Sequence, residues 1–264
     1  MSKAITVMAT FSKDNLHYLK LSLESVLNQT EKNHQIILVK DGKLTHEQEE
    51  YLASINSRNL KTIQLELNRG LPAALNCGIK QAIKDGAMYV ARMDADDISI
   101  ENRLSEQIKY LEVHSEVDIV GSYAKLIDSN SQLIGCKKVK LNVTYNDMLS
   151  KCELIHPSVL FRKTFFDNIG FYDESLLKSQ DYDLWLRALK KGVIIHNIPQ
   201  FLISFRYESG LISRRKKEQK YNLYIKKKHL SGWEYYKSII KPLFILLMPK
   251  FILRIILKQF TKTS

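Results

Sequence analysis

Three carboxylates stand within four positions of this chain, at Asp94, Asp96 and Asp97. They follow an apolar run at residues 89–93 that has the character of a buried strand. Burying unpaired carboxylates is costly, so a cation is expected beside this acidic loop, residues 94–97. A divalent metal prefers clustered oxygen ligands, and Arg92 is the alternative cation. The plainer interpretation is a solvated loop that caps the next helix.

Three further polar sites stand at the end of an expected strand or the start of an expected helix: Thr10-Phe11, Asp41, and Gln180-Asp181. The loops after parallel strands open on one edge of a sheet, where open α/β folds bind ligands. The first two sites are therefore expected to converge with the acidic loop. Asp41 could also be ordinary turn chemistry. Asp181 could simply complement a helix dipole, and Asp183 is expected to be structural.

The elements that must position these side chains alternate between short apolar strands and amphipathic helices. This alternation predicts an α/β fold whose first half is a parallel sheet. In the first half, the pattern predicts strands at 4–9, 35–39, 62–67 and 89–93, and helices at 16–27, 45–56, 73–84 and 100–114. In the second half, it predicts strands at 118–122, 123–127, 156–161 and 193–198, and a helix at 181–190.

The charge of the chain is unevenly distributed. Of its 264 residues 45% are hydrophobic, enough for one large α/β domain with or without an extension, and the net charge is +12. Residues 1–210 hold 26 basic and 26 acidic side chains, whereas residues 211–264 hold 14 basic and 2 acidic ones. The expected division is therefore a domain at 1–210 and a basic, amphipathic helical tail at 211–264.

The tail has the pattern of a segment that lies on a membrane. Prolines and charges interrupt any window of the ~20 apolar residues that a membrane span needs. Four basic residues, Lys250, Arg254, Lys258 and Lys262, recur beside apolar ones. This predicts contact with an anionic membrane surface. A solvated charged face is the alternative. Nucleic acid is not expected, because the apolar run at 243–248 would have no role there.

Cysteine usage and the amino terminus favour a cytoplasmic location. The three cysteines form no C-x-x-C pair, which argues against a disulfide framework or a zinc site. The chain moves straight into a short apolar strand and lacks the pattern of a signal peptide. The expected place is the cytoplasm, peripheral at the inner face of the cell membrane.

Five motifs together resemble the inverting family 2 glycosyltransferases of the GT-A fold. In chain order they are V-M-A-T-F-S-K-D, L-V-K-D-G-K, N-R-G-L-P-A-A-L-N-C-G-I, A-R-M-D-A-D-D and S-Q-D-Y-D-L-W-L-R-A. The resemblance covers about residues 4–205. It implies a Rossmann-like nucleotide-binding half with a mixed central sheet. The narrower likeness is to enzymes that build bacterial O-antigen, capsule or exopolysaccharide repeat units.

The resemblance also implies roles for single residues. Asp181 would be the general base, and Asp41 would accept a hydrogen bond from a uracil N–H. Lys40 departs from the family, which usually has Asp there. His156 and Trp185 are candidate acceptor contacts, with a structural histidine and a core tryptophan as the plainer alternatives. The nucleotide-binding residues would be Thr10, Phe11, Asp41, Arg69, Asp94 and Ala95, and the ligands of Mg²⁺ or Mn²⁺ would be Asp94 and Asp96.

The predicted function is transfer of a sugar from a UDP-sugar to a hydroxyl of a lipid-linked saccharide, carried on a polyprenyl diphosphate. A related sheet occurs in sugar nucleotidyltransferases, but these need a glycine-rich phosphate loop, and residues 10–15 contain no glycine. The non-enzymatic alternative is a basic peripheral membrane or nucleic-acid-binding adaptor, which would bind no uridine nucleotide.

Overall fold

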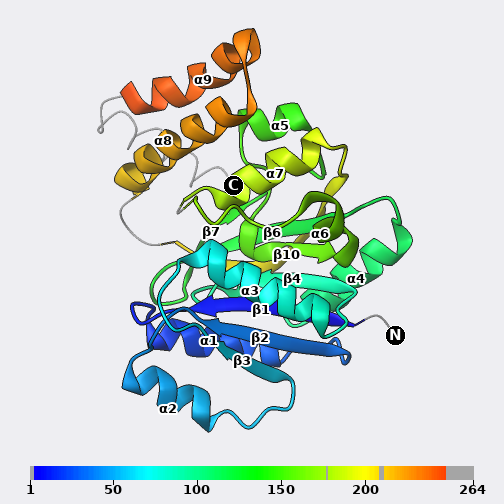
Figure 1. The fold of residues 1–264 in the computed structure, drawn as a ribbon, viewed down its shortest axis with the longest axis vertical. Coiled ribbons are helices and arrows are strands. Elements are labelled where there is room, and N and C mark those ends of the chain that lie inside the picture. Colours follow the sequence, from blue (N-terminus) through cyan, green and yellow to red (C-terminus); the bar gives the residue numbers. More distant parts are fainter. Residues whose placement is uncertain (1–2, 177, 208–210, 248–264) are drawn as a thin grey trace.

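The computed structural model describes residues 3–176, 178–207 and 211–247, with the backbone alone at 211–218, 241–242 and 245. A mixed ten-stranded sheet forms its centre, in the order β3-β2-β1-β4-β9-β6-β10-β5, with β7 beside β6 and β8 beside β10 (Figure 1). The strands are β1 (Ala4–Thr10), β2 (His34–Lys40), β3 (Leu60–Gln64), β4 (Tyr89–Met93), β5 (Ile98–Ser99), β6 (Ile119–Ile127), β7 (Leu133–Lys137), β8 (Asn142–Val143), β9 (Leu160–Arg162) and β10 (Ile195–Arg206).

Helices cover this sheet, and two more lie beyond it. Figure 1 shows α8 and α9 stacked at the end of the molecule opposite α2, with α5 and α7 between them and the sheet. The helices are α1 (Leu16–Leu27), α2 (His46–Ser54), α3 (Leu71–Lys84), α4 (Arg103–Val113), α5 (Tyr145–Ser150), α6 (Lys163–Ile169), α7 (Gln180–Lys190), α8 (Leu211–His229) and α9 (Gly232–Leu247).

The first four strands are parallel, and their register sets the position of the site. Thr10 of β1 pairs with Lys40 of β2, and Met8 pairs with Met93 of β4. The residues that follow these strands therefore meet at one edge, as the sequence predicts. Helix α3 lies close against β1 and β2, since a Cβ at Gly78 would stand 2.5 Å from a methyl group of Val7.

Three predictions for the second half need correction. The two strands expected at 118–122 and 123–127 are one strand, β6, because β10 pairs along its whole length. The strand expected at 156–161 begins as a 3₁₀ turn at His156–Ser158, for which the fixed φ of proline is suited. The strand expected at 193–198 continues to residue 206 as β10, because shifts of register between Ile198 and Ile203 accommodate its proline.

The predicted helical tail begins as two helices that contact each other and the body of the molecule. Helix α8 packs on α7, and α9 contacts α5. Lys226 of α8 is buried, and its amine donates to the carbonyls of Leu149 and Ser238, each at 2.7 Å. The basic stripe expected from Lys250 to Lys262 lies outside the described residues. Within the described part of the chain, no helix is both long and apolar enough to cross a bilayer.

Candidate active site

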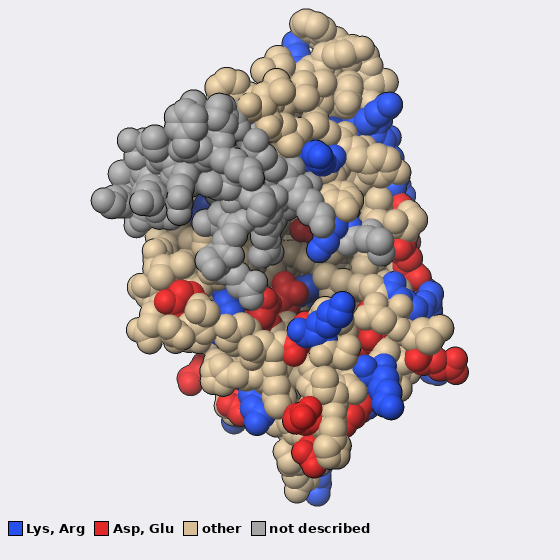
Figure 2. Space-filling view, turned by 90° about the vertical axis from the view of Figure 1, so that its left-hand side faces the viewer, with Lys and Arg blue, Asp and Glu red and all other residues tan. Residues whose placement is uncertain are grey.

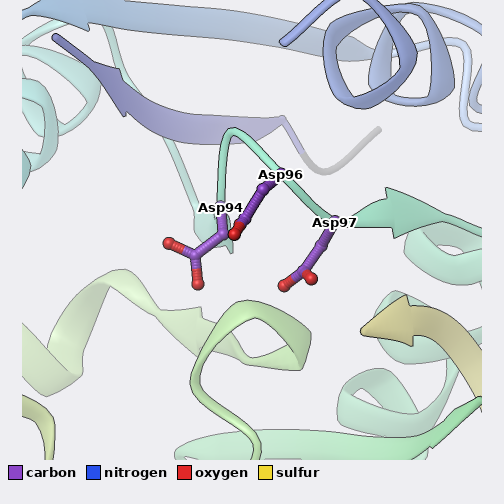
Figure 3. Close-up of side chains that lie close together, drawn as sticks. All are labelled: Asp94, Asp96 and Asp97. Atoms are coloured by element: carbon purple, nitrogen blue, oxygen red, sulfur yellow. The ribbon is translucent and has the colours of Figure 1, made fainter. Parts of the chain in front are cut away.

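The acidic loop gathers three carboxylates in the turn after β4. Figure 3 shows the side chains of Asp94, Asp96 and Asp97 projecting from this turn, and one oxygen from each lies within 4.8 Å of the others. Asp96 is exposed, Asp94 is half-buried, and Asp97 is buried. The hydroxyl of Ser22 in α1 fixes the turn by donating to the carbonyl of Asp94 at 2.6 Å. Such a group of oxygens can hold a divalent cation.

Two buried arginines hold the acidic loop in place. Arg92, at the end of β4, contacts the Asp94 carboxylate at 2.5 Å through one terminal nitrogen. Its other two nitrogens find no partner among the residues that the structure describes. Arg206, at the end of β10, donates its backbone N–H to Asp97 at 2.7 Å and its side-chain Nε to the carbonyl of Asp96 at 2.8 Å. The loop thus has fixed positive charge on one side.

These arginines do not fully compensate the negative charge of the acidic loop. Burial, followed by the charges of Asp94 and Asp96, raises the pKa of the Asp97 carboxyl well above its usual range. Partial exclusion of water, followed by the charge of Asp94, raises the pKa of Asp96 to about 6. One oxygen of Asp97 is buried and has no partner among the described residues. The donor set therefore fits a divalent cation in addition to Arg92, and it places Asp97 beside the two residues that the sequence predicts as ligands.

Thr10 and Asp41 lie together beside this loop, at the ends of β1 and β2. The backbone N–H of Asp41 donates to the carbonyl of Thr10 at 2.8 Å. The hydroxyl of Thr10 and the N–H of Phe11 both donate to the carboxylate of Asp14, each at 3.0 Å. Burial is the main cause that raises the pKa of Asp14, and the charge of Asp94 adds to it. Asp14 was not predicted as a site residue, although it ends the first of the five motifs.

The carboxylate of Asp41 organises the loop before α3. Its two oxygens accept the backbone N–H groups of Arg69 and Gly70 at 2.7 and 2.9 Å. Each carboxylate oxygen can accept a second hydrogen bond, so capacity remains for a ligand. The Arg69 side chain pairs with Glu174 at 2.9 Å. Lys40 does not bring its charge freely to this edge, because its amine pairs with Glu49 at 2.8 Å.

Asp181 stands in the first turn of α7, near the acidic loop and half-buried. Burial raises the pKa of its carboxyl. The N–H of Tyr182 and the charge of Arg92 oppose that rise, and Asp94 adds to it. Arg92 is thus within electrostatic reach of Asp181 while it contacts Asp94. Figure 2 shows the face onto which β1 and β4 point in Figure 1, where acidic side chains lie at the floor of a hollow.

Asp183, two residues further along α7, has different surroundings. It is fully buried and forms ion pairs with Arg187 at 2.9 Å, His229 at 2.8 Å and Lys228 at 3.1 Å. Burial alone would raise its pKa, but hydrogen bonds from His229, Arg187 and Lys228 outweigh it and hold the pKa well below the usual range. Asp183 therefore fixes α8 to α7, in agreement with the structural role expected from the sequence.

The two candidate acceptor residues differ. Trp185 is fully buried and stacks on Phe161 with ring centroids 5.7 Å apart, so the prediction that it contacts an acceptor is wrong and the core alternative holds. His156 is half-buried and hydrogen-bonds the hydroxyl of Tyr172 at 2.8 Å. Burial, followed by the charge of Arg92, lowers the pKa of His156 well below its usual value, so the ring is neutral. Tyr172 interacts electrostatically with Arg92, Asp181 and Asp94 and was not predicted.

Known proteins resemble this chain in sequence. Residues 6–169 match the sequence model of Glycosyl transferase family 2. An uncharacterized glycosyltransferase of Methanocaldococcus jannaschii is 31% identical over 95% of this chain and 91% of its own length. An Escherichia coli protein named UDP-Gal:alpha-D-GlcNAc-diphosphoundecaprenol beta-1,3-galactosyltransferase is 30% identical over 94% of this chain and 92% of its own.

Solved structures of Staphylococcus aureus TarS have a similar fold. The complex of its residues 1–349 with UDP-GlcNAc superposes with a TM-score of 0.66 at 17% identity, over 92% of this chain and 72% of that one. This chain spans 43% of the longer TarS chain. The likeness confirms the predicted GT-A fold. The chain belongs to glycosyltransferase family 2, whose sequence model covers more than half of it.

Proposed function

We propose that this family 2 glycosyltransferase is an inverting, metal-dependent enzyme that moves a hexosyl group from a UDP-sugar to a hydroxyl of a lipid-linked saccharide. One observation supports this above all. Asp94 of the acidic loop and Asp181 of α7 both interact with Arg92, so the proposed diphosphate site and the proposed base lie within electrostatic reach of one buried arginine. The donor and acceptor classes are those in the names of two relatives, which both act on GlcNAc-diphosphoundecaprenol.

The nucleotide would lie over the ends of β1, β2 and β4. In this proposal Thr10 and Phe11 line the uridine site, Asp41 accepts the uracil N–H, and Arg69 and Ala95 complete the pocket. The hydrogen bonds from Arg69 and Gly70 hold the Asp41 carboxylate in one orientation. The second lone pair of each of its oxygens remains available to the uracil. Asp14 holds the loop of Thr10 and Phe11 in place.

Asp94 and Asp96, joined by Asp97, would hold Mg²⁺ or Mn²⁺. When bound, such an ion stabilises the negative charge that develops on the departing diphosphate. Arg92 holds the Asp94 carboxylate in place through its contact at 2.5 Å. Arg206 fixes the backbone of the loop at Asp96 and holds the carboxylate of Asp97. The raised pKa values of Asp96 and Asp97 support the assignment, because a cation would relieve the repulsion among the three carboxylates.

Asp181 would act as the general base. Its carboxylate takes the proton of the acceptor hydroxyl while the oxygen forms a bond to the anomeric carbon. The bond from that carbon to the diphosphate oxygen breaks in the same displacement, UDP leaves, and the configuration inverts. The raised pKa of Asp181 suits this role, because a more basic carboxylate is a better proton acceptor as long as it remains ionised. Tyr172 and His156 would line the acceptor side.

We also retain, as part of the proposal, residues 1–210 as the catalytic domain and residues 211–264 as a tail on the cytoplasmic face of the membrane. The acceptor that the relatives' names specify carries a long lipid, so the enzyme must meet it at a membrane surface. The excess of basic residues in the tail supports attraction to anionic lipid. The pathway that fits these substrates is bacterial surface polysaccharide synthesis.

The test is a transfer assay with a panel of UDP-sugars and a polyprenyl-diphosphate-linked GlcNAc acceptor. Removal of metal by EDTA is expected to stop transfer, and Mn²⁺ or Mg²⁺ to restore it. The variant Asp96→Asn should lose most metal-dependent UDP binding, measured by thermal shift. The matched control is Asp167→Asn in α6, whose carboxylate pairs with Lys163 on the surface. Absence of any thermal shift with uridine nucleotides in the unmodified protein would favour the adaptor alternative.

A further inference from the structure

One face of α9 is apolar and covered by nothing that the structure describes. Trp233 is 70% exposed, Phe244 66% and Leu247 82%. Tyr236, Ile240 and Leu243 are exposed as well. Because a helix turns 100° per residue, the spacing of these six residues places them on one side of α9, on an arc of about 100°. We call this set the α9 stripe, and its six members are Trp233, Tyr236, Ile240, Leu243, Phe244 and Leu247.

The opposite face of α9 is the one that packs on the protein. Tyr235, Ser238, Ile239 and Leu246 are half-buried there, and α9 contacts α8 and α5. The buried amine of Lys226 joins α8 to the carbonyl of Ser238 on α9 and to that of Leu149 on α5. The side of α9 that carries the stripe is therefore fixed toward the outside.

The charges around the stripe identify its partner. Lys237 borders the stripe, and its amine lies 5.6 Å from the centre of the Trp233 ring. Lys220 and Lys227 of α8 are also exposed. A row of aromatic and aliphatic side chains with a lysine at its edge, on a pair of helices that exposes further lysines, has the composition of helices that lie in the headgroup region of anionic bilayers. A soluble monomer rarely leaves such a continuous apolar face in water.

We propose that the α9 stripe is the surface that enters the membrane, with α9 parallel to the bilayer and Trp233 at the level of the headgroups. This inference deepens the proposed function, since it names the lipid-contacting face of an enzyme with a lipid-linked acceptor. It also sets the orientation of the active site. Helix α9 contacts α5, and the hydroxyl of Tyr182 on α7 donates to the carbonyl of Met148 on α5 at 3.1 Å. Asp181 thus stands within a few helix widths of the lipid.

The tryptophans of the chain provide a direct test. There are two of them, and Trp185 is fully buried whereas Trp233 is 70% exposed. Fluorescence of the full chain should shift to shorter wavelength on addition of vesicles of phosphatidylglycerol and phosphatidylethanolamine. Lipids brominated on the acyl chain should quench it. Vesicles of phosphatidylcholine alone should have a much smaller effect, and the variant Trp233→Phe should show neither change.

A pair of variants tests the stripe itself. The double variant Ile240→Ser, Phe244→Ser is expected to weaken binding to the anionic vesicles at least about tenfold in a sedimentation assay, because it removes two of the apolar side chains that would be buried in the bilayer. The matched control is Leu67→Ser, Val113→Ser, which replaces two side chains that are 74% and 72% exposed elsewhere. Binding of the control should be unchanged.

Three results would overturn the inference. Trp233 emission already at short wavelength without vesicles would mean that another part of the chain covers the stripe. Concentration-dependent dimerisation that the double variant abolishes, with no response to vesicles, would make the partner a second copy. Equal binding of the double variant and the control would place lipid contact elsewhere. UDP-dependent thermal shift, measured without vesicles, tests the proposed function separately and should be the same in both variants.

Discussion

Two sides of α7 carry carboxylates two residues apart with opposite surroundings. Asp183 points toward the tail, is fully buried, and is held by Arg187, Lys228 and His229. Asp181 lies within electrostatic reach of Arg92 and Asp94, and burial raises its pKa, which the N–H of Tyr182 and the charge of Arg92 only partly oppose. Both residues stand in the positive first turn of one helix, so the helix dipole cannot explain the difference. The difference comes from the partners that the fold brings to each side.

The comparison teaches how a structural and a reactive carboxylate can be told apart. A carboxylate that stabilises the fold receives several fixed cations and a lowered pKa. A carboxylate that accepts a proton in catalysis needs a pKa that is not strongly lowered, so a cation lies near it without pairing with it directly. Variants that change only the charge on each side of α7 therefore test the assignment, and they should affect different observables.

The largest effect is expected for Asp181→Asn. Asn has the same shape and cannot take the hydroxyl proton, so turnover of UDP-sugar and acceptor should fall by about 10³-fold. The shift of the melting temperature with UDP and Mn²⁺ should be unchanged, because the proposed nucleotide site does not include this residue. Turnover within about tenfold of the unmodified enzyme would show that another group is the base.

Asp183→Asn should instead act on stability. It removes the charge of the fully buried carboxylate that Arg187, Lys228 and His229 share, which costs about 3 kcal/mol of unfolding free energy. Urea denaturation measures this. The control is Asp173→Asn, which also pairs with Lys228 but is part-exposed, and should cost less than about 1 kcal/mol. Equal losses in the two variants would mean that Asp183 has no special role.

The two carboxylates should also differ in their effects with pH, Asp183 on stability and Asp181 on turnover. A carboxyl with a lowered folded pKa stabilises the protein above its unfolded pKa of ~3.9, and this contribution is lost as the pH falls toward the folded value. The stability difference between the unmodified chain and Asp183→Asn should therefore be constant at neutral pH and shrink below about pH 4. The acid limb of kcat/KM, by contrast, should lie above pH 4, because the pKa of Asp181 is raised.

The local pattern of apolar and polar residues was sufficient to predict the first half of the fold and the sheet edge at which the site residues meet. Each of β1, β2 and β4 is a short apolar run followed by polar residues, so the meeting of Thr10, Asp41 and the acidic loop follows from parallel order alone. Strand β6 shows the limit of local pattern. Its continuity through residues 122 and 123 depends on pairing with β10, which begins about seventy residues later.

Contacts between distant parts of the chain account for what the sequence could not predict at the site. Arg206 reaches Asp96 and Asp97 from the far end of β10, and no spacing in the sequence indicates this. Trp185 was a candidate for a pocket wall as well as for the core, and in the core it stacks on Phe161 of strand β9. Asp14 is different, because it lies in the first motif, four residues after Thr10. The sequence did not indicate that its carboxylate accepts the hydroxyl of Thr10.

The smallest predicted effect is on the stability of Asp181→Asn, and its sign opposes that of Asp183→Asn. A carboxyl whose folded pKa is raised costs stability once it ionises, and the cost is absent below its unfolded pKa. Replacing it with neutral Asn should therefore raise the melting temperature slightly at pH 7 in metal-free protein. At pH 3.5, where most of the Asp181 carboxyl is protonated in the folded chain, the two proteins should melt within about a degree of each other. A lower melting temperature for Asp181→Asn at pH 7 would mean that its carboxylate is held by the fold as Asp183 is, and the contrast between the two sides of α7 would no longer support a catalytic role.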